Sequence, residues 1–250
     1  MKILGIKKQN NKYKIKLEDN ITIETYDEVI IKNNILYKKE IDEELKNKIE
    51  EENKYYETYN EIVKLINKKL RSEKEIKEYM NKKEIKDQEK LIQKLKDSNL
   101  INDELYAKAF IHDRISFSND GINKIKTELI KQGIEENIIE NELNKIDRED
   151  QKEKLEKLIM KKLKTNTKYS DKIIKQKITN YFITLGYNKD DINEILEQQN
   201  TNNNEIIKKE YNKLINKYKT KYEGEKLKYT IKQKLYQKGF NLEEINEIIN

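Results

Sequence analysis

Few side chains in this chain are of the kinds that usually carry out catalysis. His112 is the one histidine, there is no cysteine, and 47 aspartates and glutamates are spread along the sequence. Among so many carboxylates, a pair at a spacing suited to acid–base catalysis is expected by chance, and such residues usually form solvated helix faces with nearby lysines. His112 fits a partly exposed helical position better than a catalytic one. No glycine-rich phosphate loop, HExxH zinc motif or Gly-x-Ser-x-Gly turn occurs. We therefore expect no catalytic residue, no metal site and no cofactor, in a protein that is not an enzyme.

The cations are more informative than the carboxylates. Of the 53 lysines and arginines, three are arginines. The planar guanidinium of arginine binds a carboxylate or a phosphate through two hydrogen bonds, which lysine cannot imitate. Arg71 and Arg114 are therefore our leading candidates for contact with a partner. The alternative, left open by the sequence, is that each arginine binds a carboxylate of its own helices, such as Glu75 or Asp103.

Lysines concentrate in stretches with helical spacing, and each of these stretches is followed by an acidic one. Such segregation favours a partner with a long, regular charge pattern, although both kinds of face could equally be ordinary solvated surfaces. A few of the 16 tyrosines could stack the bases of single-stranded nucleic acid, while most occupy apolar positions. The candidate residues for contact with a partner protein or DNA are Arg71, Lys74, Arg114, Lys124, Lys126, Lys131, Lys175, Lys177, Lys228 and Lys232.

These side chains lie in a repeated pattern. Gly133, Gly186 and Gly239 are 53 residues apart, and apolar residues recur at matching distances on both sides of each glycine. A fixed period with matching surroundings indicates a tandem repeat. The apolar columns eight and four residues before the glycine and one and six residues after it are Ile125, Ile178 and Ile231; Leu129, Phe182 and Leu235; Ile134, Tyr187 and Phe240; and Ile139, Ile192 and Ile245.

Each of these glycines stands where a helix is expected to end. Glycine adopts the left-handed conformation that closes a helix without a Cβ penalty, and the next apolar residue can then fold back on the helix. An earlier unit at residues 55–99 fits the same pattern in a shifted register, with Ile76, Met80 and Ile85 in its apolar columns. Glu84 takes the place of the glycine there. We expect a looser or differently closed turn at Glu84.

Composition narrows the class of protein further. The chain has 250 residues, of which 40% are charged and 35% hydrophobic, and a net charge of +6. The apolar residues have helical spacing, so a disordered chain is not expected. No run approaches 18 apolar residues and no signal-peptide pattern opens the chain, so we expect a protein that is neither exported nor membrane-spanning. The lack of cysteine fits the cytosol.

The first part of the chain differs from the rest. Alternating apolar and polar residues predict three strands at residues 1–9, 12–18 and 21–25, joined by tight turns at Asn10-Asn11 and Asp19-Asn20. A short helix or turn near residues 26–32 and a charged helical connector at residues 43–53 are expected next. From residue 54 the pattern is helical to the end, with three helices in each repeat, as at residues 103–117, 122–132 and 135–146.

The expected fold is mainly α-helical: an elongated tandem array of three-helix repeats with a small N-terminal antiparallel β element. A single unit of about 50 residues buries too little apolar surface to be robust alone, so neighbouring units are expected to share a core. The expected domains are a meander with its connector at residues 1–53, and three-helix repeats at residues 54–101, 102–147, 148–200 and 201–250.

Two segments resemble conserved blocks of the RecX family, the regulators of the RecA recombinase. Residues 70–76 (LRSEKEI) are similar to the family's R-S-x-x-E-[LI] opening, and residues 100–107 (LINDELYA) to its L-I-[DN]-D-x-x-[YF]-A block. Glu84 and Gln132 depart from the family pattern, which usually has glycine and lysine at these places. The remaining matches, including the G-x-x-x-I-x-x-x-L-x-x-x-G-[IVF] pattern, are Arg114, Gly121, Ile125, Leu129, Gly133 and Ile134.

This resemblance implies a fold of tandem three-helix repeats and a protein that regulates without catalysis. It implies binding to the RecA filament, which limits strand exchange and ATP hydrolysis in DNA repair, recombination and the SOS response, together with weak, non-specific DNA binding. We expect a cytoplasmic monomer. Two other functions stay open: a helical-repeat nucleic-acid-binding module acting without RecA, whose binding would fall steeply with salt, and a structural protein–protein scaffold.

Overall fold

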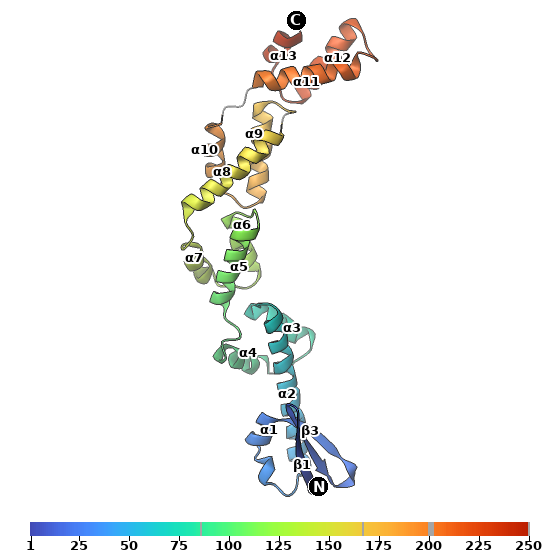
Figure 1. Cartoon of the computed structure of the whole chain (residues 1–250), viewed down its shortest axis with the longest axis vertical. Helices are drawn as coiled ribbons and strands as arrows, with labels where there is room; N and C mark the ends of the chain where they lie inside the picture. The colour runs from blue at the N-terminus through green and yellow to red at the C-terminus, as the bar shows by residue number, and fades with distance from the viewer. Residues whose placement is uncertain (86, 167, 200–202, 250) are drawn as a thin grey trace. The chain divides into compact units, whose positions relative to one another are not determined.

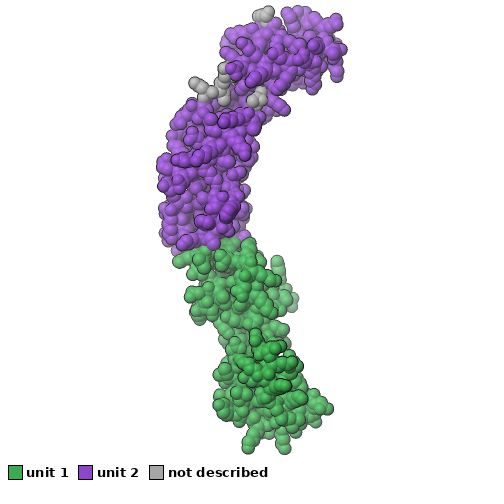
Figure 2. Space-filling view, viewed as in Figure 1, with its two compact units in different colours: residues 1–106 green, residues 107–250 purple. Residues whose placement is uncertain are grey.

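The computed structural model describes residues 1–85, 87–166, 168–199 and 203–249, and it divides into two compact units, residues 1–106 and 107–250 (Figures 1 and 2). Its described residues form thirteen α-helices and one three-stranded antiparallel sheet near the N-terminus. The predicted class, mainly α-helical with a small N-terminal β element, is confirmed. The predicted division between residues 200 and 201, and the last residue of the final repeat, lie outside the described residues.

The N-terminal sheet is the predicted meander. Its strands β1 (Ile3–Gln9), β2 (Lys12–Leu17) and β3 (Thr22–Tyr26) pair antiparallel in the order β1-β2-β3. Three of the four predicted turn residues are left-handed, with φ of 55° at Asn10, 62° at Asp19 and 60° at Asn20, the last two within the short 3-10 helix η1 (Glu18–Asn20). Asn and Asp tolerate this conformation better than most residues, which is why these pairs end the strands.

One face of the sheet packs against the elements that follow it. These are α1 (Asp27–Lys32), the 3-10 helix η2 (Ile35–Tyr37) and the first part of α2 (Glu43–Lys68). Every second side chain of β2 points to this core, as the strand period requires. The buried residues of this N-terminal cluster are Ile15, Leu17, Ile23, Tyr26, Val29, Ile30, Ile35, Ile41 and Ile49.

The helix α2 is continuous over 26 residues, so it crosses residue 53, where the sequence predicted the end of a connector. Asn53 ties the helix to the sheet, because its amide donates to the carbonyl of Glu24 and its oxygen accepts from the hydroxyl of Thr25, both at 2.7 Å. The N-terminal cluster takes Ile49 from α2, and the next cluster takes Ile62. A single helix therefore serves two hydrophobic cores.

The rest of the first unit contains α3 (Glu73–Lys82) and α4 (Gln88–Asp97). A capping box begins α3: Ser72 Oγ accepts from the Glu75 N–H, and Glu75 Oε2 accepts from the Ser72 N–H, both at 3.2 Å. The second cluster consists of the buried residues Ile62, Ile66, Ile76, Met80, Leu91, Ile92, Leu95 and Ile101.

The helices that follow agree closely with the predicted ones. The first predicted range reappears as α5 (Asp103–Phe117), and α6 (Ile122–Lys131) ends one residue before the predicted residue 132. The helix α7 (Glu136–Leu143) begins one residue after the predicted residue 135 and ends three residues before the predicted residue 146. The remaining helices are α8 (Arg148–Thr165), α9 (Asp171–Thr184), α10 (Lys189–Glu197), α11 (Asn203–Tyr218), α12 (Gly224–Gln237) and α13 (Leu242–Ile249).

The recurrent glycines close their helices as the sequence predicted. The φ angles are 81° at Gly133 and 87° at both Gly186 and Gly239. In each turn, the next residue donates its N–H back to the carbonyl five residues earlier, for example from Tyr187 to Phe182 at 3.0 Å. The residue after each glycine is buried, as a Schellman-type cap requires.

The expectation of a looser turn at Glu84 is wrong. Glu84 has a φ of 53°, and Ile85 donates its N–H to the carbonyl of Met80 at 3.1 Å, the same closure as at the glycines. The left-handed conformation costs a non-glycine residue roughly 1–2 kcal/mol. The hydrogen bond and the partial burial of Ile85 offset that cost.

Within the second unit, successive repeats join at the turns that contain Gly186 and Gly239. The N–H of Gly121 donates to the carbonyl of Leu185 at 2.6 Å, and the N–H of Asn123 to that of Gly186 at 3.1 Å. The unpaired N–H groups at the start of α6 thus meet the last carbonyls of α9, which satisfies both helix ends and aligns their dipoles. The N–H of Ser170, just before α9, donates to the carbonyl of Lys238 at 2.9 Å in the corresponding joint.

Candidate partner-binding surface

Arg114 and its neighbours form a charged cluster around Asp120. The guanidinium of Arg114 lies 3.3 Å from Asp120 Oδ2 and 2.7 Å from Glu128 Oε2. Lys124 Nζ lies 2.6 Å from Asp120 Oδ1. Burial alone would raise the pKa of the Asp120 carboxyl, but hydrogen bonds from Lys124 and Ser118 and the charge of Arg114 outweigh it and hold this pKa below its usual value.

A lysine of α8 joins this cluster from the next repeat. Lys154 Nζ donates to the carbonyls of Ile115, at 2.6 Å, and Ser118, at 2.8 Å, at the end of α5. Burial lowers the pKa of Lys154, although the charge of Asp120 acts in the opposite direction. Burial, with the nearby charge of Asp120, raises the pKa of Tyr187 to about 12. The cluster is therefore a joint between repeats, and Arg114 is held inside it.

Arg71 is likewise engaged by its own helix. Its Nη1 donates to Glu75 Oε1 at 2.9 Å, and Glu75 is the carboxylate of the α3 capping box. The sequence also raised Asp103 as a carboxylate that an arginine could bind. In the structure, Asp103 Oδ1 accepts a hydrogen bond from the backbone N–H of Glu73 at 3.0 Å. Glu75, one of the two carboxylates considered, thus lies at ion-pair distance from Arg71.

Most of the candidate lysines of the second unit also have partners nearby. Lys126 lies 3.0 Å from Glu140 on α7, and Lys175 lies 3.2 Å from Asp171 in its own helix. Lys177 Nζ lies 3.2 Å from the centre of the Tyr169 ring, a cation–π contact. Basic and acidic helices of one repeat therefore neutralise part of each other's charge.

The remaining candidate lysines are dispersed. Lys74 and Lys131 are exposed on α3 and α6. On α12, Lys232 Nζ donates to the side-chain oxygen of Asn246 at 2.9 Å, while Lys228 is exposed and has no ion pair within the described part of the chain. The structure thus gathers Arg114 and Lys124 around one carboxylate and leaves Lys228 to solvent.

Several tyrosines that could have stacked bases are occupied. Lys94 Nζ lies 4.4 Å from the ring centre of Tyr56 and 4.3 Å from that of Tyr59, and it also contacts Tyr55. Burial lowers the pKa of Lys94 in this group, while the charge of Glu28 acts against that shift. These contacts link α4 to α2, and each of the three rings has the ammonium of Lys94 over it.

The third arginine, Arg148, was not among the predicted contact residues. It is exposed at the start of α8 and makes no hydrogen bond or ion pair to any described residue. It lies on the edge of a groove of about 670 Å³. The same scarcity that drew attention to Arg71 and Arg114 could have identified it. The groove is lined by Ile122, Asn123, Lys126, Glu140, Leu143, Asn144, Ile146, Arg148, Glu149, Gln151, Lys152, Leu155, Gly186, Tyr187, Asn188 and Asp191.

Among the described residues, no group of three or more histidines, aspartates or glutamates is arranged to hold a metal ion. No described helix has the length and apolar character needed to cross a bilayer. The features of this surface that remain are the exposed Arg148 and Lys228 and the groove of about 670 Å³.

The fold defines a mainly helical protein of three-helix domains. Residues 102–143 match the family model described as "RecX, second three-helix domain". The chain is 31% identical to the "Regulatory protein RecX" of Bacillus cytotoxicus, over 87% of this chain and 83% of that protein. It is 28% identical to the protein of the same name from Oceanobacillus iheyensis, over 98% of this chain and 94% of that protein. The chain therefore belongs to the RecX family of regulatory proteins.

A solved structure shares the fold. A "Crystal structure of regulatory protein RecX" aligns with a TM-score of 0.71 at 22% identity, over 79% of this chain and 99% of that chain. At this identity the likeness concerns the fold alone. It supports the helical architecture that the sequence pattern predicted.

Proposed function

We propose that this protein binds RecA nucleoprotein filaments and restrains RecA-catalysed strand exchange and ATP hydrolysis. The observation that carries the proposal is membership of a family of regulatory proteins, with a relative 31% identical over 87% of the chain. The protein would act in the cytoplasm, as a monomer and by binding without catalysis, in DNA repair, recombination and the SOS response.

The cations of the second unit support a contact with a polyanionic partner. Arg148 and Lys228 are exposed and make no ion pair among the described residues, so binding them would not require an existing pair to break. Arg71 and Arg114, in contrast, are committed to carboxylates of their own unit. We therefore assign the principal contact to the exposed cations, and a supporting role to the paired arginines.

The decisive experiment compares RecA–DNA filaments with naked DNA in a pull-down at moderate salt, followed by strand-exchange and ATPase assays. Retention on filaments well above retention on naked DNA, with slower strand exchange, is the expected result. A stoichiometric amount of purified protein that leaves strand exchange and ATP hydrolysis unchanged would refute the proposal.

A second function, nucleic-acid binding without RecA, is favoured by the outer face of α12. Tyr229 and Tyr236 are 63% and 62% exposed there, beside the exposed Lys228. Open aromatic faces next to cations suit single-stranded nucleic acid. In this case naked oligonucleotide would bind as well as filaments do, and affinity would fall steeply as salt rises.

A further inference from the structure

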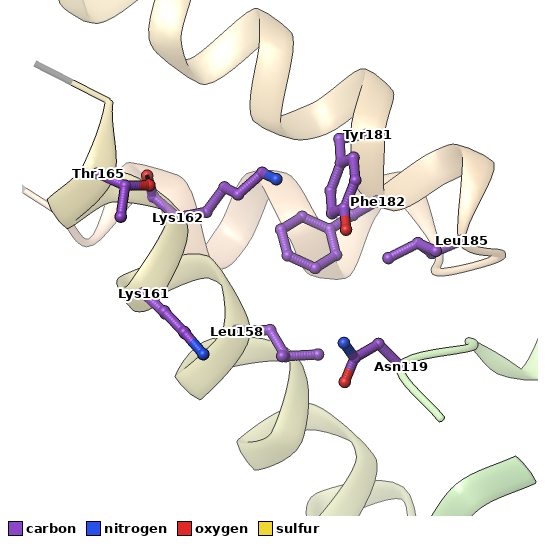
Figure 3. A pocket seen from close by; sticks show the side chains of 8 residues that line it. All are labelled: Asn119, Leu158, Lys161, Lys162, Thr165, Tyr181, Phe182 and Leu185. Atoms are coloured by element: carbon purple, nitrogen blue, oxygen red, sulfur yellow. Dashed lines mark hydrogen bonds between the residues drawn. The ribbon is translucent and has the colours of Figure 1, made fainter. Parts of the chain in front are cut away.

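A second hollow in the second unit has a different chemical character from the groove beside Arg148. Its volume is about 280 Å³, and it is lined by residues of α8, α9 and the loop between α5 and α6 (Figure 3). Leu158, Phe182 and Leu185 supply an apolar floor. The amide of Asn119 faces Leu158 across the hollow, as Figure 3 shows.

The charged residues that line this hollow are all cations. Lys161 and Lys162 belong to α8, and no aspartate or glutamate is among the lining residues. Neither lysine makes an ion pair with any residue that the structure describes. The Nζ of Lys162 lies 3.8 Å from the centre of the Tyr181 ring, which holds this ammonium at the edge of the apolar floor. Two uncompensated positive charges thus border an apolar seat large enough for one bulky side chain.

We propose that this hollow binds an acidic peptide segment of a partner protein. One aliphatic or aromatic side chain of the peptide would sit on Leu158, Phe182 and Leu185, and its flanking carboxylates would face Lys161 and Lys162. Small pockets filled by a single large apolar side chain commonly supply most of the affinity of a protein interface. Charges at the rim add specificity and speed association.

The geometry favours a peptide over single-stranded nucleic acid. A base would need an open aromatic face, and Lys162 already covers a face of the Tyr181 ring. The floor is formed by two leucines and the buried ring of Phe182, which suit an aliphatic or aromatic side chain. Asn119 is exposed and makes no hydrogen bond to a described residue, so its amide can bond a peptide backbone across the hollow.

This site is separate from the proposed filament contact. None of its lining residues is among the arginines and lysines assigned above. Failure of RecA binding would therefore leave the peptide site standing, and failure of the peptide site would leave the filament contact standing.

The test is fluorescence anisotropy with the full-length protein at moderate salt. The probe is a short fluorescein-labelled peptide of glutamates and aspartates with phenylalanine and leucine at its centre. Lys161→Glu reverses an exposed charge at the hollow, and we expect it to weaken binding by about tenfold, because it replaces an attraction with a repulsion. Lys164→Glu makes the same change on an exposed lysine of α8 outside the hollow, and we expect a change of about twofold or less.

A second pair of variants tests the hollow without altering its charge. Asn119→Trp would place an indole ring beside Leu158 and compete with the peptide, whereas Asn119→Ala leaves the hollow open. Asn119 is exposed, so both variants are expected to fold, and circular dichroism checks this. We expect loss of peptide binding for Asn119→Trp alone.

Several outcomes would overturn the proposal. The peptide could fail to bind, or bind equally well with serines in place of phenylalanine and leucine. Equal losses in Lys161→Glu and Lys164→Glu would indicate diffuse charge attraction. An oligothymidine that displaces the peptide and is itself weakened by Lys161→Glu would assign the hollow to nucleic acid. Sedimentation showing a dimer that Lys161→Glu dissociates would assign it to a second copy of this chain.

Discussion

At the scale of single residues, Asp120 is the point where the charges of neighbouring helices meet. Its side chain is 8% exposed and lies within ion-pair distance of Arg114 and Lys124. A buried carboxylate is costly unless cations and hydrogen bonds compensate it. The cluster satisfies that condition, so the joint between α5, α6 and α8 depends on this carboxylate remaining ionised.

We predict that Asp120→Asn lowers the free energy of unfolding and weakens its dependence on acid. The pKa of Asp120 is depressed in the folded state, so its contribution to stability is complete above the usual aspartate pKa and is lost as pH falls through the depressed value. The variant removes the carboxylate of Lys124 and leaves Arg114 with Glu128 alone, at a cost of about 1–3 kcal/mol at neutral pH. Urea unfolding across the acid range measures both effects. The matched control is Asp113→Asn, at a 73% exposed position of α5; equal losses in the two variants would contradict the prediction.

Arg71 is paired with a carboxylate, whereas Arg148 makes no ion pair with a described residue, and this difference gives a second prediction. Arg71→Ala should lower stability by roughly 0.5–1 kcal/mol, because it breaks an ion pair with the carboxylate that caps α3. Arg148→Ala removes no described contact and should leave stability within about 0.5 kcal/mol of the original. Filament affinity, in contrast, should fall more for Arg148→Ala than for Arg71→Ala in a co-sedimentation assay. The reverse order of affinities would assign the contact to the predicted residue, Arg71.

At the scale of secondary-structure elements, the glycine turns have two functions. They end one helix, and the turns at Gly186 and Gly239 also bring its last carbonyls onto the start of a helix in the preceding repeat. A Cβ on Gly186 would overlap the backbone of Lys124, and one on Gly121 would overlap the backbone of Gly186. Glycine is therefore required at this joint by close approach as well as by its left-handed conformation.

We expect Gly186→Ala to be among the more damaging single substitutions in the second unit. It combines a strained φ of 87° with an overlap that only movement of α6 against α9 can relieve. The expected loss in urea unfolding is about 2–4 kcal/mol. The control is Gly224→Ala, where φ is also positive at 54° but nothing lies near the added Cβ, and there we expect about 1 kcal/mol. Equal losses at the two positions would remove the argument from close approach.

At the Glu84 turn, a substitution to glycine is expected to raise stability. Because Glu84 holds a left-handed conformation with a φ of 53°, Glu84→Gly should relieve strain and raise the free energy of unfolding by up to about 1 kcal/mol. Glu89→Gly, in the first turn of α4, provides the control and should lower stability. A loss of stability in Glu84→Gly would show that the turn gains more from the carboxylate than from relaxed geometry.

Local chemistry decided which of these elements could be predicted from the sequence. Asn10, Asp19 and the three recurrent glycines mark turns by their own backbone preferences, so the meander and the helix ends followed from them. The continuity of α2 could not be predicted in this way, since its connection to the sheet through Asn53 is a contact between residues distant in sequence. The pairing of Arg114 with Asp120 and Glu128 depends on how a loop folds back onto α6, which spacing alone does not specify.

At the scale of the whole molecule, many of the buried side chains of the described residues gather in successive clusters along the chain. One joins the sheet to α1 and α2, another joins α2 to α4, and two more lie within α8–α10 and α11–α13. Neighbouring clusters of the second unit touch through Ile206. A chain with this arrangement has stability that is mainly local, as in other repeat proteins.

We therefore predict that damage to one cluster stays near that cluster. Leu235 is fully buried in the last cluster, and Leu235→Ala should cost about 2–5 kcal/mol there. Hydrogen exchange followed by mass spectrometry should show lost protection in α11, α12 and α13, a smaller change in α8–α10, and none in β1–β3. The control is Leu242→Ala, at a 51% exposed position of α13, which should change little. If β1–β3 lost protection as fully as α12 in Leu235→Ala, the chain would unfold as one cooperative unit, and independent repeats would be the wrong description of its stability.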